Sequence, residues 1–311
     1  MRRLLITFGC SWTFGVCSGY TAGMSKKDLL PLSQDSSLND RLSFRGLLSK
    51  KYNLTNKNFA SGGSSNQRQF RLAKEFFSSD EFVKLRNEFD EVIVLWGITS
   101  TARNEMWSLE LGNLHNFFYN DSSLLSKALV KYQYNHEHEI TQLAMEMQHW
   151  NMIFKNLNVK NLWFDTFNHH SYHIPGPRIE KFKKEYNTFR GPDWPDWEDF
   201  ARNEFKVADE IRNELLDKSR QWGWTILFPS AIQNLMFNDE NPRDLLSKLA
   251  INHGIDELDG KYHKSDWSID SNRIEYLTKC GILNPHSTHP TQQGHLEIAD
   301  MLSDYIEAVL Q

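Results

Sequence analysis

Short apolar runs alternate with amphipathic segments along most of the chain. The run Val92–Trp96 is continuously apolar, which is typical of a strand buried on both faces of a parallel sheet. In the segment before it, apolar residues recur at helical spacing at Phe70, Ala73, Phe76 and Phe77. Strands that alternate with helices predict an α/β protein with a mostly parallel sheet covered by helices on both faces.

The pattern predicts five strands and four helices in a single domain that spans residues 1–311. Residues 18–40 are predicted to form a polar loop. The predicted strands are Leu4–Phe8, Asn53–Phe59, Glu91–Trp96, Asn161–Phe167 and Trp224–Phe228. The predicted helices are Ser43–Tyr52, the segment that carries Phe70 to Phe77, Leu143–Leu157 and Gln292–Leu310. Because crossovers between parallel strands are right-handed, the carboxyl ends of the first four strands should share one edge of the sheet.

Three segments are longer than simple connections require and are expected to be loop insertions: 109–140, 173–205 and 235–281. Long insertions on the loop side of a sheet commonly shape substrate selection or partner contacts. The middle insertion contains Trp194 and Trp197 between prolines and acidic residues. These rings either stack on the apolar face of a sugar or close a small hydrophobic core over the sheet.

Ser11 is the first candidate for chemistry, because the first apolar run ends abruptly at Gly9 and Cys10 and presents a serine directly afterwards. A serine hydroxyl becomes a good nucleophile only when a positioned base takes its proton, and that base need not be close in sequence. His289, near the other end of the chain, is the candidate base. Alternatively, Ser11 is a helix N-cap and His289 is a structural residue before the last helix.

Two further segments place glycine and hydroxyl residues at predicted strand ends. Residues 58–66 contain Gly63 and end at Asn66, and Gly97 and Thr99 follow the strong apolar run of the third strand. At such positions backbone N–H groups can point into a crevice beyond the carboxyl ends of a parallel sheet and stabilise an oxyanion. Gly63 also fits a simpler role, in a turn that needs a positive φ.

Four segments in this order resemble the sequence blocks of the SGNH/GDSL hydrolases, a family of esterases, lipases and carbohydrate deacetylases. The first block reads Gly-Asp-Ser after a strand, and the chain has Gly-Cys-Ser ending at Ser11, so the nucleophile is kept and the aspartate is replaced. The second block reads Asn-x-Gly/Ala-x-x-Gly, and Asn58, Ala60 and Gly63 fit it. The resemblance implies that Gly63 contributes to the oxyanion hole.

The third and last blocks depart further from the family. The third reads Gly-x-Asn-Asp, and this chain has Gly97 but Thr99 and Ser100 in the Asn and Asp places. The last reads Asp-x-x-His-Pro, and the chain keeps His289 before a proline but has His286 where the acid would stand. The resemblance therefore implies a Ser–His dyad, which an acid such as Asp165 or Asp270 from another loop would complete to a triad.

The resemblance implies a three-layer, flavodoxin-like α/β/α sandwich and a serine esterase or deacylase that needs no metal or organic cofactor. The expected substrate is a carboxylic ester with a small or carbohydrate-linked acyl group. Ser11 and His289 would be catalytic. Candidates around the oxyanion and the substrate are Gly63, Thr99, Asn66, His286 and His169, the last because it follows the predicted fourth strand. The alternative is an SGNH-like body that has lost the activity and serves as a binding or assembly module.

Charge and composition limit the partners that we expect. The formal net charge is −5 with signs interspersed, so the sequence has no electrostatic footprint for nucleic acid. No apolar run approaches the roughly 20 residues of a membrane helix, and the short run after Met1 is read as a first strand and not as a signal peptide. Three cysteines without a CxxC pair favour a reducing compartment, and we expect a cytoplasmic protein. The sequence leaves both a monomer and an oligomer open.

Histidine clusters raise the possibility of a metal site. His136 and His138 flank a glutamate, and His169, His170 and His173 lie close together in the sequence. Neither cluster has a recognised ligand spacing, and a solvated helix face explains the first. The sequence therefore predicts no metal.

Overall fold

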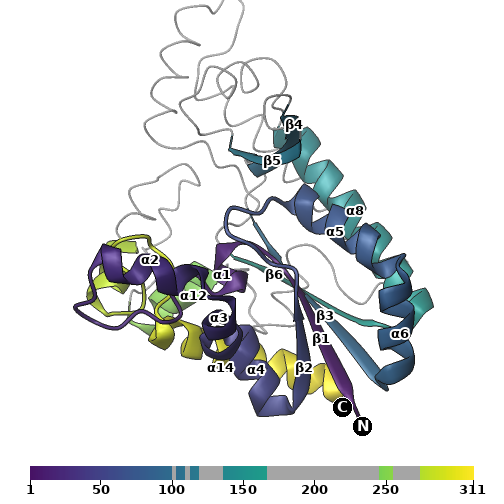
Figure 1. The fold of residues 1–311 in the computed structure, drawn as a ribbon, viewed down its shortest axis with the longest axis horizontal. Coiled ribbons are helices and arrows are strands. Elements are labelled where there is room, and N and C mark those ends of the chain that lie inside the picture. The colour runs from purple at the N-terminus through teal and green to yellow at the C-terminus, as the bar shows by residue number, and fades with distance from the viewer. Residues whose placement is uncertain (100–102, 109–112, 119–135, 167–244, 255–273) are drawn as a thin grey trace, which may run out of the picture.

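The structure is a computed structural model, and Figure 1 shows the strands and helices that its described residues form. The described residues are 1–99, 103–108, 113–118, 136–166, 245–254 and 274–311.

Four parallel strands form the central sheet. They are β1 (Arg3–Phe8), β2 (Leu54–Asn58), β3 (Glu91–Ile98) and β6 (Lys160–Asp165), in the order β2-β1-β3-β6 (Figure 1). Each pairs with its neighbour in parallel register, so their carboxyl ends lie at one edge. The four predicted strands in this part of the chain are confirmed, and the fifth, at 224–228, lies outside the described residues.

Helices cover both faces of this sheet. On one face lie α4 (Phe44–Tyr52) and α14 (Gln292–Leu310), with α12 (Leu245–Asn252) beside α14 (Figure 1). The helices on the other face are α5 (Asn66–Phe77), α6 (Asp80–Glu88) and α8 (His136–Leu157). The chain is therefore a three-layer α/β/α structure, and its strand order, with β1 between β2 and β3, is that of a flavodoxin-like sheet.

Side-chain caps explain why the helices begin where they do. Ser65 Oγ accepts a hydrogen bond from the N–H of Arg68 at the start of α5, and Thr291 Oγ1 accepts one from Gly294 at the start of α14. Each cap satisfies a backbone N–H group that has no partner within the first turn. The last helix consequently has the bounds that the sequence predicts.

The prediction of a polar loop over residues 18–40 is wrong. The structure has two helices there, α2 (Lys26–Gln34) and α3 (Ser36–Leu42). Ser25 caps the first by accepting from the N–H of Asp28, and Asp35 caps the second by accepting from two backbone N–H groups. The polar composition that indicated a loop therefore belongs partly to helix caps.

A small antiparallel hairpin, which the sequence pattern did not predict, follows the third strand. Its strands are β4 (Arg103–Ser108) and β5 (Asn113–Phe118), paired along their whole length. Arg71 of α5 anchors the hairpin by donating from Nε and Nη2 to the two carboxylate oxygens of Glu105, at 2.7 and 2.8 Å. β4 lies just before the first of the three long segments, 109–140, and β5 lies within it. Residues 173–205, with Trp194 and Trp197, lie outside the described residues.

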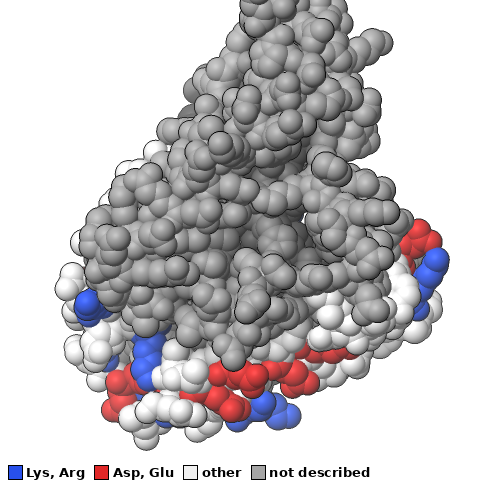
Figure 2. Space-filling view, turned by 180° about the vertical axis from the view of Figure 1, so that it is seen from behind, with Lys and Arg blue, Asp and Glu red and all other residues white. Residues whose placement is uncertain are grey.

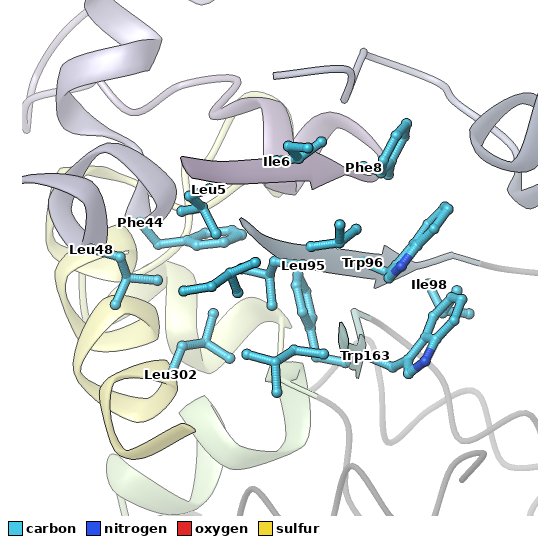
Figure 3. Packing of buried hydrophobic residues seen from close by; sticks show 14 of the residues in the cluster. Leu5, Ile6, Phe8, Phe44, Leu48, Leu95, Trp96, Ile98, Trp163 and Leu302 are labelled. Carbon is cyan, nitrogen blue, oxygen red and sulfur yellow. The ribbon is translucent and has the colours of Figure 1, made fainter. Parts of the chain in front are cut away.

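An aromatic ladder crosses the sheet on the side of α5 and α8. Phe59, the residue after β2, stacks on Phe8 with ring centroids 5.0 Å apart. Phe8, Trp96 and Trp163 then stack from β1 to β6, with ring centroids 4.4 and 4.7 Å apart (Figure 3). The parallel register places Phe8, Trp96 and Trp163 beside one another on adjacent strands. On the opposite face, Leu5 packs toward Phe44 of α4 (Figure 3). These two layers of buried side chains fix the sheet on which the candidate site rests.

The outer surface of the described residues carries both signs of charge. Acidic and basic side chains lie next to one another along the visible rim (Figure 2). Ion pairs such as Arg3–Glu91 and Lys57–Glu81 connect many of them. None of the described helices combines the length and the apolar character that are needed to cross a bilayer.

Candidate active site

Ser11 lies where the sequence pattern places it, directly beyond the carboxyl end of β1. It is the first residue of the single helical turn α1 (Ser11–Phe14), and it is 6% exposed. The Ser11 carbonyl accepts from the N–H groups of Gly15 and Val16, both at 3.0 Å. Gly15 ends the turn with φ of +93°, a conformation that favours glycine.

Two glycines make room for the turn that carries Ser11. A Cβ on Gly9, after β1, would lie 2.1 Å from Thr13 Oγ1, and a Cβ on Gly97, in β3, would lie 2.3 Å from the same atom. Thr13 itself is fully buried. Gly97, which also matches the third family block, is therefore required sterically for α1 to rest on the strand ends.

The loop that contains Gly63 is tied to the same place. The N–H of Ser61 donates to the carbonyl of Gly9 at 3.2 Å, two residues before Ser11. Asn58 holds the loop entrance, since its Oδ1 accepts from the Ala60 N–H at 3.0 Å. Gly63 has φ of +70°, which agrees with the expected turn. The second family-like segment thus lies beside the first.

Asn66 joins the second segment to the third through one backbone position. Its Oδ1 accepts from the Thr99 N–H at 2.9 Å, and its Nδ2 donates to the Thr99 carbonyl at 2.7 Å. The Thr99 N–H therefore already donates to an acceptor within the protein. The Thr99 hydroxyl is buried and has no hydrogen bond among the described residues. Asn66 acts as a clamp on the end of β3, and Ser100 lies outside the described residues.

His289 occupies a short, closed loop immediately before α14. The His289 carbonyl accepts from the N–H of Asn284 at 2.8 Å, and the Asn284 carbonyl accepts from Thr288 at 2.9 Å. Asn284 Oδ1 also accepts from the N–H of His286 at 2.6 Å. The bridge between Leu283 and Pro290 closes the loop at its base. Backbone hydrogen bonds therefore fix the peptide that carries the imidazole.

This loop docks on the residues that follow α1. Cys17 Sγ and Ser287 Oγ lie 3.1 Å apart, although 270 positions separate them in the sequence. His286 Nε2 lies 3.1 Å from the Met24 carbonyl, and its ring contacts Tyr20 edge to face. The structure therefore brings the segments around Ser11 and His289 together. Among the described residues no hydrogen bond joins the two side chains directly.

Burial keeps the His289 imidazole neutral at neutral pH. It lowers the pKa of His289 to about 4, the nearby Ser287 carbonyl opposes this shift, and the charge of Arg103 in β4 adds to it. A neutral imidazole is the form that a general base needs. His289 Nδ1 is buried and makes no hydrogen bond of normal geometry with a described residue.

His295 is a second buried imidazole, one turn into α14 and behind the His289 loop. It is fully buried, and its Nδ1 accepts from the Phe44 N–H at 3.4 Å. Burial lowers the pKa of His295 to about 3, and the charges of Arg45 and His289 add to this. In the sequence, the one sign that this histidine packs in the core is its place on the apolar face of the helix.

We expect His295 to make the fold sensitive to acid. The unfolded chain binds a proton at this ring below about pH 6.5, whereas the folded chain does not, so the free energy of unfolding falls as the pH falls from 6.5 toward the folded value. One such group contributes a slope of up to about 1.4 kcal/mol per pH unit. Urea unfolding at pH 6.5, 5.5 and 4.5 gives the free energy of unfolding at each pH. This free energy should change less with pH in His295→Gln than in the wild type. His149→Gln, on the exposed face of α8, is the control and should show the same pH dependence as the wild type. The same pH dependence in all three proteins would contradict the role of His295.

Several other predicted residues cannot be placed. His169, His170, His173 and Asp270 lie outside the described residues, and nothing is described of the side chain of Asp165. His136 is the first residue of α8, and His138 lies in the same helix. The backbone at both histidines is therefore helical, as expected for a solvated helix face. Within the described part of the chain, no group of three histidine, cysteine or acidic side chains is arranged to hold a metal ion.

Comparison with known proteins finds distant likeness among solved structures. No protein-family profile matches the chain, and neither does a curated protein. Among solved structures it is similar to the crystal structure of the psychrotrophic esterase EstA from Pseudoalteromonas sp. inhibited by monoethylphosphonate, with 10% sequence identity and a TM-score of 0.42. The match spans 99% of this chain and 98% of that one. A likeness of this degree assigns no activity to the chain.

Proposed function

We propose that this protein is a serine-dependent hydrolase of carboxylic esters, with Ser11 as nucleophile and His289 as general base. The contact between Cys17 and Ser287, at 3.1 Å, is the observation that carries the proposal. It joins the residues just after the Ser11 turn to the loop of His289 and so supports the proposal that both side chains lie at one edge of the sheet. Residues at that edge commonly form the active sites of open α/β folds.

In the proposed reaction, His289 takes the proton of the Ser11 hydroxyl while the oxygen attacks the ester carbonyl. The bond to the alcohol then breaks, and the imidazolium returns its proton to the leaving oxygen. Water repeats the sequence on the acyl-enzyme and releases the acid and free Ser11. The oxyanion would be held by the N–H group of Ser11, at the start of a helical turn, and by that of Gly63, in a tight loop. The Thr99 hydroxyl would be a third donor.

The proposed substrate is an ester with a small or carbohydrate-linked acyl group. Its support is in the sequence, where the long insertions are polar and aromatic and no extended apolar stretch is suited to a lipid. The neutral His289 imidazole supports activity well below neutral pH, because the base loses its function only when it is protonated, near pH 4.

A second candidate function is a binding or assembly module without catalysis. It is favoured by Nδ1 of His289, which has no hydrogen-bond partner among the described residues, since a carboxylate at that nitrogen normally fixes the tautomer of a catalytic histidine. The use of the Thr99 N–H by Asn66 also removes one oxyanion donor. The ester hydrolase remains the better-supported proposal, because hydrogen bonds in free enzymes often tighten only when substrate binds.

A fluorophosphonate probe tests the proposal, because it reacts only with an activated serine. We expect one adduct per chain, placed on Ser11 by peptide mass spectrometry. Ser11→Ala and His289→Ala should both abolish it. Ser49→Ala is the matched control, since Ser49 is also buried and its hydroxyl has no hydrogen bond among the described residues. A folded wild-type protein that takes up no label would favour the binding module.

A further inference from the structure

Arg45 is a fully buried arginine directed at the turn that carries Ser11. It is the second residue of α4 and has no exposed surface. Its Nε donates to the Thr13 carbonyl and its Nη2 to the Phe14 carbonyl, both at 3.0 Å. Its Nη1 lies 2.5 Å from Asp40 Oδ1, and the Asp40 side chain is 52% exposed. The guanidinium therefore connects a surface carboxylate with the end of α1.

The turn that Arg45 holds is too short to be stable by itself. α1 contains four residues, and a single helical turn fixes several backbone angles for very few hydrogen bonds. The carbonyls at the end of a helix have no N–H partner within it. The planar fork of an arginine satisfies two of them at once, and its positive charge suits the negative end of a helix.

Close packing between α1 and the start of α4 reinforces this connection. A Cβ on Gly15, the residue that ends α1, would lie 2.5 Å from Cβ of Ser43, the N-cap of α4. The Thr13 side chain is held in turn between the ends of β1 and β3. The end of the turn is thus fixed by α4 and its middle by the sheet, while Ser11 at its start makes no side-chain hydrogen bond with a described residue.

We propose that Arg45 is a positioning residue, which holds the α1 turn so that the Ser11 hydroxyl faces His289 for attack on an ester. This inference rests on the proposed function. Arg45 does not touch the reacting atoms and acts through the carbonyls of Thr13 and Phe14. A displacement of about 1 Å in a nucleophile can cost about 10²-fold in rate, so loss of these two hydrogen bonds should impair the reaction strongly.

Arg45→Met tests the inference, because methionine fills similar space without the donors to the two carbonyls. We expect the urea midpoint to fall, because the Thr13 and Phe14 carbonyls lose their partners, and circular dichroism without urea should show that the variant is folded. The rate constant for fluorophosphonate labelling of Ser11 should fall about 10²-fold, and kcat for ester hydrolysis should fall while KM stays within about two-fold. Asp40→Asn, which leaves both carbonyl contacts in place, should label within about three-fold of the wild-type rate.

Hydrogen exchange separates this inference from the proposed function. The N–H groups of Gly15 and Val16 donate to the Ser11 carbonyl, so their protection reports the order of α1 without any chemistry. Arg45→Met should lower their protection and leave that of β1 unchanged. If Ser11 of the wild type does not react with the probe, the proposed function fails. If hydrogen exchange at Gly15 and Val16 is the same in Arg45→Met as in the wild type, the positioning role of Arg45 is overturned, whatever the outcome for the function. Wild-type labelling rates in Arg45→Met would also overturn it.

Discussion

Replacement of Ser11 by alanine is expected to lower kcat/KM for hydrolysis of a small ester, such as p-nitrophenyl acetate, by about 10³-fold or more. The reason is that a hydroxyl at this position is the proposed nucleophile, and the backbone donors around it cannot form a covalent intermediate. The fold should tolerate the change, since the Ser11 hydroxyl makes no hydrogen bond with a described residue and alanine is a good helix former at the start of α1.

The control for Ser11→Ala is again Ser49→Ala, which removes a buried hydroxyl from α4. It should hydrolyse the ester at nearly the wild-type rate. Circular dichroism and urea unfolding should show that both variants are folded. Equal hydrolysis by the wild type and by folded Ser11→Ala would remove Ser11 from the mechanism, whatever the source of the remaining activity.

The second large effect is expected in stability, from Trp96→Ala. Trp96 is fully buried in β3, stacks between Phe8 and Trp163, and donates from Nε1 to Asn161 Oδ1 at 2.8 Å. Removal of a buried indole leaves a cavity and costs about 3–5 kcal/mol in the free energy of unfolding. Urea unfolding followed by circular dichroism measures this loss.

Two comparison variants make this result interpretable. Trp96→Phe keeps a ring in the ladder and should cost less than Trp96→Ala. Val83→Ala, on the exposed side of α6, should change the free energy of unfolding by no more than about 0.5 kcal/mol. If Trp96→Ala unfolds no more easily than Val83→Ala, the aromatic ladder does not stabilise the sheet as the packing indicates.

The sheet and its main helices could be predicted from the sequence because each has a strong periodic signal. β3 is continuously apolar, and α14 begins directly after the cap residue Thr291. The hairpin of β4 and β5 was missed because its six-residue strands mix polar and apolar side chains. The helices α2 and α3 were missed because their caps and polar faces look like a loop in the sequence.

For the candidate site, sequence reasoning found the residues with recognisable chemistry and missed those that hold them. Ser11 and His289 stand out as a serine and a histidine at element ends. Asn66 was predicted to line the site, which stays a prediction, and the sequence did not indicate that its amide clamps the Thr99 backbone. Arg45 was missed, although one arginine among the apolar residues of a core helix was a usable signal. Such roles depend on contacts between distant segments, which no local pattern encodes.

The central claim, that Ser11 and His289 act as one unit, is tested most directly by a double-mutant cycle on the rate of ester hydrolysis. Ser11→Ala, His289→Ala and the double variant should lose activity to nearly the same degree, because either change disables the same step. His149→Ala, on the exposed face of α8, serves as the control for the histidine. Losses that multiply in the double variant would show that the two side chains act independently and would contradict the account.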